Sequence, residues 1–483
     1  NDLLVAINDE LKNVVKPDNS IEESINITDS AIVTMSGMFS GRQSVLNNIE
    51  SFLHGNSQLM CLVGESGCGK SSVLARIADL NIKEGKCVVP FFAGIDDFST
   101  TVENMVKSSI LRLSNYLHTE LCFDPKAEEF DYKELLSQFF NLLNKASLSS
   151  QVIVVVDALN QLLRSPLEEK LKWINLFALN PNVKIIVSST NDYYQLNIVK
   201  SLNADFLNLE FFSVSDIEEV TKHYFSMNHK EIDTQVLSAI MNKKSNELNL
   251  CSLPVYLLTV LQQLNNIDGD DFSAIHNRER ELGESASDAI INYLTEIVTT
   301  APDEIGALLD VSLDRVAKKV GDLAYLFSNV IALSRRGITE KYIAKICSHL
   351  NIDFDSISFS YYRKLMKNNL CERENGSWDF NHSLIKNYFK NSVKTVSKDK
   401  IINSMISILE IEDNASQFKK TDFVYWLNLG NRLDLFVPYF YEQKNNPQVC
   451  EAFLSELQIN PTSETIAKLF FPASIYTGVV WDF

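Results

Sequence analysis

The sequence lacks paired cysteines, long apolar runs and an excess of positive charge. Its eight cysteines are scattered, without a C-x-x-C pair or a histidine cluster nearby, so we expect neither a disulfide framework nor a structural zinc site. No run approaches the roughly 20 apolar residues of a membrane span, and no secretory signal opens the chain. We therefore expect a cytoplasmic protein whose thiols are reduced. We expect no membrane partner.

Acidic residues outnumber basic ones. The chain has 62 Asp and Glu against 44 Lys and Arg, which gives a formal net charge of −18. A protein that coats nucleic acid needs the opposite balance, because phosphate binding requires Lys or Arg counter-charge. Nucleic acid is therefore not an expected partner, although a local basic patch remains compatible with this total.

Length and composition describe a globular protein of several domains. At about 150 residues per domain, 483 residues suggest about three domains, and an apolar content of 45% is enough for large cores. The chain begins with Asn1 rather than Met and ends at Phe483, so we expect it to be a fragment of a longer protein.

The order of the predicted elements divides the chain into five segments. We expect an N-terminal helix and polar linker, an α/β domain with a parallel sheet, a helical domain, a winged helix and an α-helical C-terminal region. The helix at the start suits either the end of an upstream effector domain or a helix packed on the next domain. The boundaries are 1–35, 36–212, 213–329, 330–394 and 395–483.

Two kinds of pattern support this division. Short apolar segments alternate with amphipathic helical patterns up to about residue 212, which is typical of a parallel sheet covered on both faces. The predicted strands are 59–63, 87–93, 152–156, 184–189 and 205–212. A helix is predicted over 1–16, and helical patterns follow the sheet at 214–226, 230–243, 254–265, 284–299 and 311–328. Further along, Asn375-Gly376 is a strong hairpin turn between two short strands, and helices followed by such a hairpin indicate a winged helix.

One motif carries clear chemistry. Residues 64–71 fit G-x-x-x-x-G-K-[ST], preceded by a buried strand and followed by a helix, which is the context of a phosphate-binding P-loop. Backbone N–H groups and the helix N-terminus would hold the phosphates of ATP or ADP, Lys70 would reach the β- and γ-phosphates, and Ser71 would bind Mg²⁺. The predicted nucleotide-binding residues of the loop are Gly64, Glu65, Ser66, Gly67, Cys68, Gly69, Lys70, Ser71 and Ser72.

A second motif follows at the end of the strand 152–156. Asp157 suits the carboxylate that holds Mg²⁺ in P-loop NTPases. Ala158 stands where motor ATPases place a glutamate that activates water, and the next polar side chains, Asn160 and Gln161, are amides that can orient water without taking its proton. We therefore predict slow hydrolysis.

Polar residues also follow the next strand. Thr190 and Asn191, after Ser188-Ser189, are candidates to sense the γ-phosphate, and a plain polar loop is an equally good interpretation.

The class of P-loop protein follows from what accompanies these motifs. No N-K-x-D occurs, so guanine specificity is unsupported, and FSGRQ precedes the P-loop, whereas the similar ABC-transporter signature lies after it. A separate strand, 87–93, lies between the P-loop and Asp157 in the sequence, which suits the additional-strand class.

Several segments resemble the STAND NTPases of NACHT-like type, closest to nephrocystin-like and telomerase-associated proteins and to prokaryotic antiviral STAND sensors. The likeness spans about residues 36–392. The segments that carry it are Phe39–Gln43, VVPFFAGIDDFSTTVENMV, Asp157–Leu162, Trp173 with Pro181–Lys184, Ser252–Leu257 and Trp378–His382.

The resemblance implies roles for three further residues. Arg42 would belong to the nucleotide site, Pro254 would pack near the adenine, and His382 would contact the β-phosphate of ADP and lock a resting state. Two departures stand out, because Thr190-Asn191 replaces the arginine usual after the fourth strand and Ser252 replaces the glycine of G-x-P.

The resemblance also implies a function. It predicts an ADP-locked switch that opens when its C-terminal region senses a protein trigger, exchanges to ATP and Mg²⁺, forms a homo-oligomer and activates a fused effector, in antiviral or innate immune signalling. Two alternatives remain open: an AAA+-like remodelling ATPase and a DNA-binding regulator that uses the winged helix through Arg363, Lys364 and Lys367.

Overall fold

The computed structural model describes most of the chain as two compact units. The first unit ends at Glu210 and the second begins at Phe211, and each is treated by itself below. The described residues are 21–96, 98–121, 131–162, 171–193, 196–367, 369–373 and 376–443, together with 446, 449, 452, 453 and 456. The predicted helix over residues 1–16 therefore lies outside the described residues.

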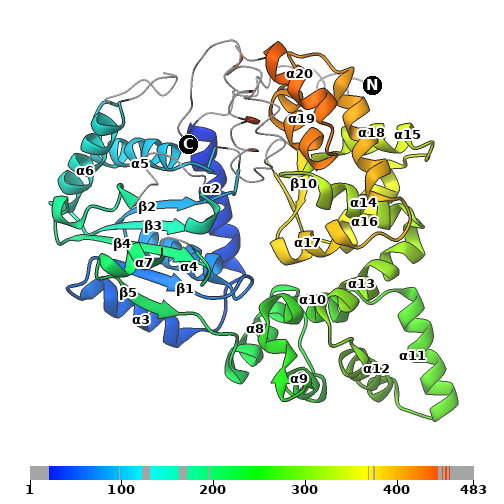
Figure 1. Cartoon of the computed structure of the whole chain (residues 1–483). Coiled ribbons are helices and arrows are strands. Elements are labelled where there is room, and N and C mark those ends of the chain that lie inside the picture. The colour runs from blue at the N-terminus through cyan, green and yellow to red at the C-terminus, as the bar shows by residue number, and fades with distance from the viewer. Residues whose placement is uncertain are drawn as a thin grey trace, which may run out of the picture. The chain divides into compact units, whose positions relative to one another are not determined.

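The first unit is built on a parallel sheet. Its strands are β1 (Leu59–Val63), β2 (Cys87–Phe92), β3 (Val152–Asp157), β4 (Val183–Ser189) and β5 (Asp205–Asn208). They lie side by side in the order β2-β3-β4-β1-β5, as Figure 1 shows. The strand inserted in space between the P-loop strand β1 and the Asp157 strand β3 is β4, whereas the strand that separates the two motifs in sequence, β2, takes the edge. The additional-strand order is confirmed.

Helices cover both faces of this sheet. Alternate side chains of β1, β3 and β4 form one core with α5 and α6, and α4 packs on β2 and β3. The strands are buried along nearly their whole length except β5, which is why most residues of the other four are apolar. The helices of this unit are α2 (Ile21–Gly37), α3 (Gln43–His54), α4 (Lys70–Lys83), α5 (Val102–Leu117), α6 (Tyr132–Ser147) and α7 (Leu196–Ser201).

The polar stretch predicted as a linker is a helix from Ile21 onward, so that prediction was wrong there. The buried face of α2 consists of Ile21, Ser24, Thr28, Ile32 and Ser36, spaced at helical intervals but largely hydroxylic, so the apolar pattern was hidden. α2 packs against α4 and α5. The Ser36 hydroxyl donates to the Asp79 carboxylate of α4 (2.5 Å), and Arg112 of α5 pairs with Asp29 (2.8 Å).

The second unit is mainly helical in its described part. One core joins α8, α9, α10 and α12, and a larger core runs from α13 to the end of the described residues. The helices are α8 (Val214–Met227), α9 (Thr234–Met241), α10 (Pro254–Asn265), α11 (Gly269–Leu282), α12 (Ala286–Thr300), α13 (Ile305–Val320), α14 (Leu323–Leu333), α15 (Glu340–His349), α16 (Ser356–Leu365), α17 (Ser383–Asn391), α18 (Lys398–Glu410), α19 (Gln417–Leu429) and α20 (Leu433–Gln443).

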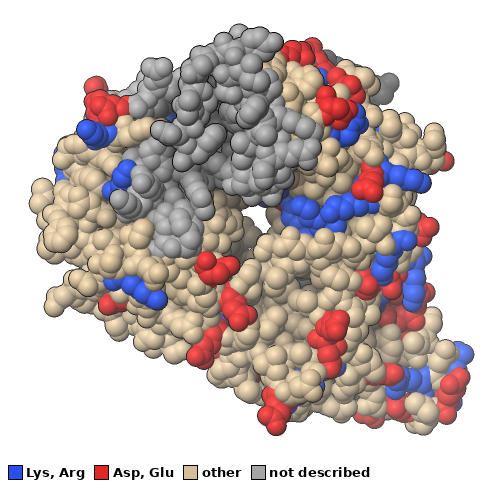
Figure 2. Space-filling model, in the orientation of Figure 1, with Lys and Arg blue, Asp and Glu red and all other residues tan. Residues whose placement is uncertain are grey.

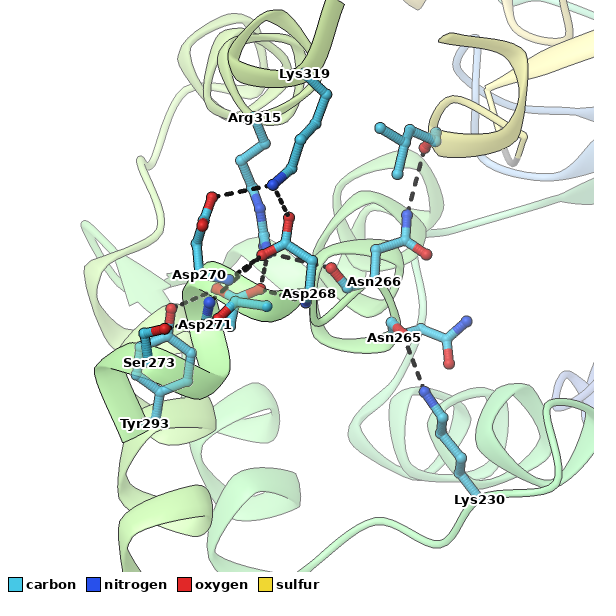
Figure 3. Close-up of polar contacts among 12 residues, drawn as sticks. Lys230, Asn265, Asn266, Asp268, Asp270, Asp271, Ser273, Tyr293, Arg315 and Lys319 are labelled. Atoms are coloured by element: carbon cyan, nitrogen blue, oxygen red, sulfur yellow. Dashed lines mark hydrogen bonds and ion pairs between the residues drawn. The ribbon is translucent and has the colours of Figure 1, made fainter. Parts of the chain in front are cut away.

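Two helix predictions need correction. The pattern at 311–328 predicted one helix, but Gly321, at φ 65°, separates α13 from α14. α11 was not predicted because its sequence is mostly polar. Its N-terminus is fixed instead by polar contacts, drawn in Figure 3: Lys319 of α13 pairs with Asp270 (3.1 Å), and Arg315 pairs with the buried Asp271.

A small antiparallel sheet lies within the larger core of the second unit. β10 (Ser377–Phe380) pairs with β9 (Leu370–Glu372) and with β8 (Ile338–Thr339). The predicted hairpin strands are confirmed by the pairing of Trp378 with Glu372. Gly376 of the predicted turn has φ 72°, while Asn375 lies outside the described residues. α14 to α17 pack around this sheet.

Candidate nucleotide-binding site

The P-loop is in close contact with the backbone of Leu209 at its first residue, Gly64. A Cβ on Gly64 would lie 2.7 Å from the Leu209 carbonyl oxygen and 2.8 Å from Cys68 Sγ, so only glycine fits. Gly67 and Gly69 have φ of 86° and 96°, the left-handed region that glycine adopts without strain. A Cβ on Gly69 would meet nothing within 4 Å, so the loop is tight at its base and open at the side facing α4's first turn.

The start of α4 supplies backbone donors. Its hydrogen-bond ladder begins with the N–H of Val73, which donates to the Gly69 carbonyl (3.1 Å). The N–H groups of Lys70, Ser71 and Ser72 precede that bond and have no acceptor within the helix. Together with the positive end of the helix dipole, they make a site suited to phosphate.

Lys70 lies folded along the loop. Its ammonium donates to the carbonyls of Gly64 (2.7 Å) and Glu65 (2.8 Å) and lies 3.8 Å from Cys68 Sγ. Burial raises the pKa of the Cys68 thiol, and the nearby charges of Lys70 and Arg42 oppose that rise only in part. The thiol is therefore protonated at neutral pH and is packed within the loop.

Asp157 is buried at the carboxyl end of β3. Burial raises the pKa of its carboxyl group, while hydrogen bonds from Ser188 and Ser71 and the charge of Lys70 act in the opposite direction. The predicted metal-binding pair, Ser71 and Asp157, is thus brought together, although β4 lies between the P-loop strand β1 and the strand β3 that ends in Asp157. In this parallel sheet the P-loop after β1 and Asp157 at the end of β3 lie at the same edge, which is why the two side chains can meet.

Ser188 belongs to the polar segment 188–191 that the sequence suggested as a γ-phosphate sensor, but its contact with Asp157 was not predicted. It is fully buried in β4, its hydroxyl donates to Asp157 Oδ1, and it accepts from the backbone N–H of Ala158 (2.8 Å). It therefore fixes both the carboxylate and the turn after it, where Ala158 has φ 56°. The signal was present in the sequence, because β4 neighbours β3 in additional-strand sheets and the polar pair Ser188-Ser189 ends a strand that is apolar apart from Lys184.

Arg42 contacts the backbone of the P-loop. Its guanidinium donates to the carbonyl of Cys68 (2.7 Å) and to the carbonyl of Glu210 (2.8 Å), and the residue is buried at φ 59°. The structure therefore places Arg42 on the P-loop backbone. Its predicted contact with the nucleotide itself stays a prediction.

The four residues predicted to take part in catalysis lie at the same edge of the sheet. Asn160 and Gln161 are exposed on a short 3₁₀ turn after β3, and the Gln161 amide lies against Gly94 of the loop after β2. Thr190 hydrogen bonds to Asp192, and Asn191 is exposed.

Asp192 is a residue that was overlooked. It is exposed, and the hydrogen bond from Thr190 lowers the pKa of its carboxyl group, with a smaller contribution from the charge of Lys70. It is therefore the carboxylate that follows β4 on the P-loop side of the sheet.

Two predicted nucleotide contacts belong to the second unit. Pro254 is the buried first residue of α10. His382 caps α17, and its Nδ1 accepts from the N–H of Leu384 (3.2 Å), which places the proton of a neutral ring on Nε2. Their contacts with adenine and phosphate stay predictions.

The donor set fits a nucleotide with Mg²⁺. The first-turn N–H groups of α4 and Lys70 are phosphate donors, and the hydroxyl of Ser71 beside the carboxylate of Asp157 is an oxygen pair of the kind Mg²⁺ prefers. Bound Mg²⁺ would neutralise phosphate charge. Elsewhere among the described residues there is no group of three or more His, Cys, Asp or Glu suited to a metal ion. Nor, in the same part of the chain, is any helix long and apolar enough to cross a membrane.

Comparison with known proteins agrees with the motifs. Residues 43–190, which run from α3 past β4, match the family model described as nephrocystin 3, N-terminal. No match was found among curated proteins.

Matches to solved structures have low TM-scores and low sequence identities. A Walker-type ATPase of Pyrococcus abyssi is 14% identical, with 73% of this chain and 96% of that chain covered and a TM-score of 0.34. The RuvB Holliday junction branch migration motor of Thermotoga maritima is 14% identical (73% and 96% covered, TM-score 0.30), and AMPPCP-bound DnaA from Aquifex aeolicus is 12% identical (81% and 93%, TM-score 0.32). Such scores leave the assignment to the motifs, the strand order and the family match, which give the first unit an α/β P-loop fold with a nucleotide-binding site.

Proposed function

We propose that this chain is a nucleotide-controlled switch of the STAND type. ADP holds a resting form, exchange to ATP and Mg²⁺ stabilises a homo-oligomer, and a protein trigger sensed through the C-terminal region starts the exchange. The output is the activation of a fused effector, in antiviral or innate immune signalling.

The observation that carries this proposal is the convergence of the P-loop residues Lys70 and Ser71 on Asp157, with no carboxylate in the position after Asp157. Ser71, Lys70 and Asp157 converge, whereas Ala158 occupies the position that follows the carboxylate, in a left-handed turn pinned by Ser188. On the turn after β3, the exposed Asn160 and Gln161 supply amides, and the exposed carboxylate at this edge, Asp192, follows β4 rather than Asp157. Such a site favours slow ATP hydrolysis, so the bound nucleotide lasts long enough to mark a state.

The second unit supports the switch over a motor. In the proposal, β8, β9 and β10 with α15 to α17 are the winged helix, and His382 is the residue that senses the β-phosphate of ADP. Its Nδ1 is committed to capping α17, so Nε2 is the nitrogen suited to donate to phosphate. A ligand shifts a conformational equilibrium only through its different affinity for the two forms, and this histidine would supply that difference.

DNA binding through the winged helix is disfavoured. The Arg363 guanidinium lies over the rings of Phe359 (5.1 Å) and Trp378 (4.7 Å), which commits one of the three cations to a packed position. On the face drawn in Figure 2, the second unit shows one small basic patch, and elsewhere its basic and acidic side chains are interspersed.

Nucleotide-dependent assembly tests the proposal. Purified chain is analysed for nucleotide content, steady-state ATP turnover and mass in the presence of ADP and of a slowly hydrolysed ATP analogue. We expect retained ADP, turnover well below one per minute, and an increase in mass only with the analogue. Lys70→Ala should abolish nucleotide retention without loss of secondary structure, and His382→Ala should release ADP faster. Many turnovers per minute in the absence of any trigger would support the remodelling ATPase instead.

A further inference from the structure

The chain that leaves the first unit is attached directly to the P-loop. After β5, the N–H of Leu209 donates to the carbonyl of Val63, the last residue before the loop (2.7 Å). The Leu209 carbonyl lies so near Gly64 that a Cβ there would be 2.7 Å away. Leu209 therefore touches the base of the phosphate loop by both of its backbone polar groups, one residue before the unit ends.

Arg42 makes the next link. One arm of its guanidinium donates to the carbonyl of Cys68 inside the P-loop, and the other donates to the carbonyl of Glu210, the last residue of the unit. Both acceptors are backbone oxygens, so these two hydrogen bonds depend on where the backbone lies and not on which side chains residues 68 and 210 carry. Arg42 is buried at φ 59°, a left-handed conformation that is unfavourable for a residue with a Cβ, so the surrounding structure holds the arginine in this place.

The far side of the connection is anchored as well. In the second unit, the N–H of Phe212 donates to the carbonyl of Ser252 (2.8 Å), two residues before α10 begins at Pro254. Two short hydrogen bonds therefore fix Glu210 on one side and Phe212 on the other. The backbone torsions free to change without breaking either anchor are confined to about three residues, 210–212.

We propose that Arg42 is a positioning residue that couples the P-loop to a hinge at residues 210–212. Phosphate bound in the loop fixes the loop's conformation and therefore the position of the Cys68 carbonyl. Because the same guanidinium is hydrogen bonded to both carbonyls, the position of the Glu210 carbonyl is then fixed as well. The hinge is then fixed in a nucleotide-dependent place before any contact between nucleotide and the second unit is made. This inference rests on the proposed switch and adds a route that is independent of His382.

The planar fork of arginine suits this task. Two carbonyls in different directions are met by two N–H groups held in one rigid plane, whereas a lysine ammonium at the end of a flexible stem would favour one of them. Arg42→Lys therefore keeps the charge near the loop and weakens the bridge. Arg42→Ala removes both.

Hydrogen exchange on the full chain tests the coupling. Amide exchange is followed in peptides that cover the P-loop, 64–72, and the connector, 205–212, with and without saturating ADP. In the unaltered protein we expect ADP to slow exchange in both. In Arg42→Lys and Arg42→Ala, saturating ADP should still protect the P-loop, while the connector should exchange about ten-fold faster than in the unaltered protein. Gln43→Ala is the matched control, because this exposed neighbour bonds only with Asn47 of its own helix.

The outcomes separate the two proposals. If ADP protects neither peptide in the unaltered protein, the proposed nucleotide switch fails. If ADP protects both peptides equally in the unaltered protein and in the Arg42 variants, the switch stands and the coupling role of Arg42 is refuted. If Arg42→Ala does not fold, Arg42→Lys decides the question alone, since its lysine keeps the positive charge and most of the apolar stem.

Discussion

Removal of the Ser188 hydroxyl tests whether this residue holds Asp157 in place. Ser188→Ala deletes the donor to Asp157 and the acceptor for the Ala158 N–H, both buried. A hydrogen bond to a charged group contributes about 1.5–3 kcal/mol, and a buried donor left without a partner costs about 1–3 kcal/mol. Because the two effects overlap within one small network, we expect a loss of about 2–4 kcal/mol in the free energy of unfolding.

The same change should weaken Mg²⁺ binding. Residues that hold a metal ligand in place typically contribute 10- to 100-fold to metal affinity, and Ser188 is one of two hydroxyls that fix Asp157. We therefore expect the affinity for ATP to fall by about 10- to 100-fold in the presence of Mg²⁺ and much less in its absence. Titration of a fluorescent ATP analogue at several Mg²⁺ concentrations measures both quantities.

The neighbouring serine provides the control. Ser189 is equally buried in β4, but its hydroxyl has no hydrogen-bond partner in the structure. Ser189→Ala removes the same oxygen from the same strand and should leave stability and Mg²⁺ dependence unchanged or slightly improved, because a buried hydroxyl without a partner is unfavourable. Equal losses in the two variants would refute the role given to Ser188.

Two further predictions concern packing and charge around the P-loop. Gly64→Ala should lower the free energy of unfolding by about 1–3 kcal/mol and abolish nucleotide binding, because its Cβ meets the Leu209 carbonyl and Cys68; Gly269→Ala, whose Cβ meets nothing within 4 Å, should be neutral in the same denaturation and binding assays. At Asp79, burial raises the pKa, but hydrogen bonds from Lys83 and Ser36 outweigh it and leave the pKa lowered. The ionised carboxylate therefore stabilises the fold above the unfolded pKa near 3.9, and this contribution is lost as the pH falls through the folded value. Asp79→Asn should cost about 1–3 kcal/mol at pH 7, and urea unfolding should show the difference shrinking below about pH 4; a constant difference would contradict the assignment.

Much of the first unit was predictable because its signals are local. Parallel strands buried on both faces read as unbroken apolar runs, and the P-loop must follow such a strand. The predicted Mg²⁺ pair, Ser71 and Asp157, came together as expected because the sheet order brings β1 and β3 to either side of β4.

What escaped prediction depends on partners far away in sequence. α2 buries serine and threonine rather than apolar side chains, so its helical face is visible only once α4 and α5 are in place. α11 is held by ion pairs to α13, about 45 residues later. The bond from Arg42 to Glu210 spans 168 positions, and no local pattern announces it.

The position of α2 has a mechanical consequence. It lies along the helix that begins at Lys70, and Ser36 reaches into that helix at Asp79. A shift of α4 on phosphate binding would be passed to α2 through this hydroxyl–carboxylate hydrogen bond. α2 is therefore a second element of the first unit, besides the connector after β5, that is in direct contact with a segment leaving the phosphate site.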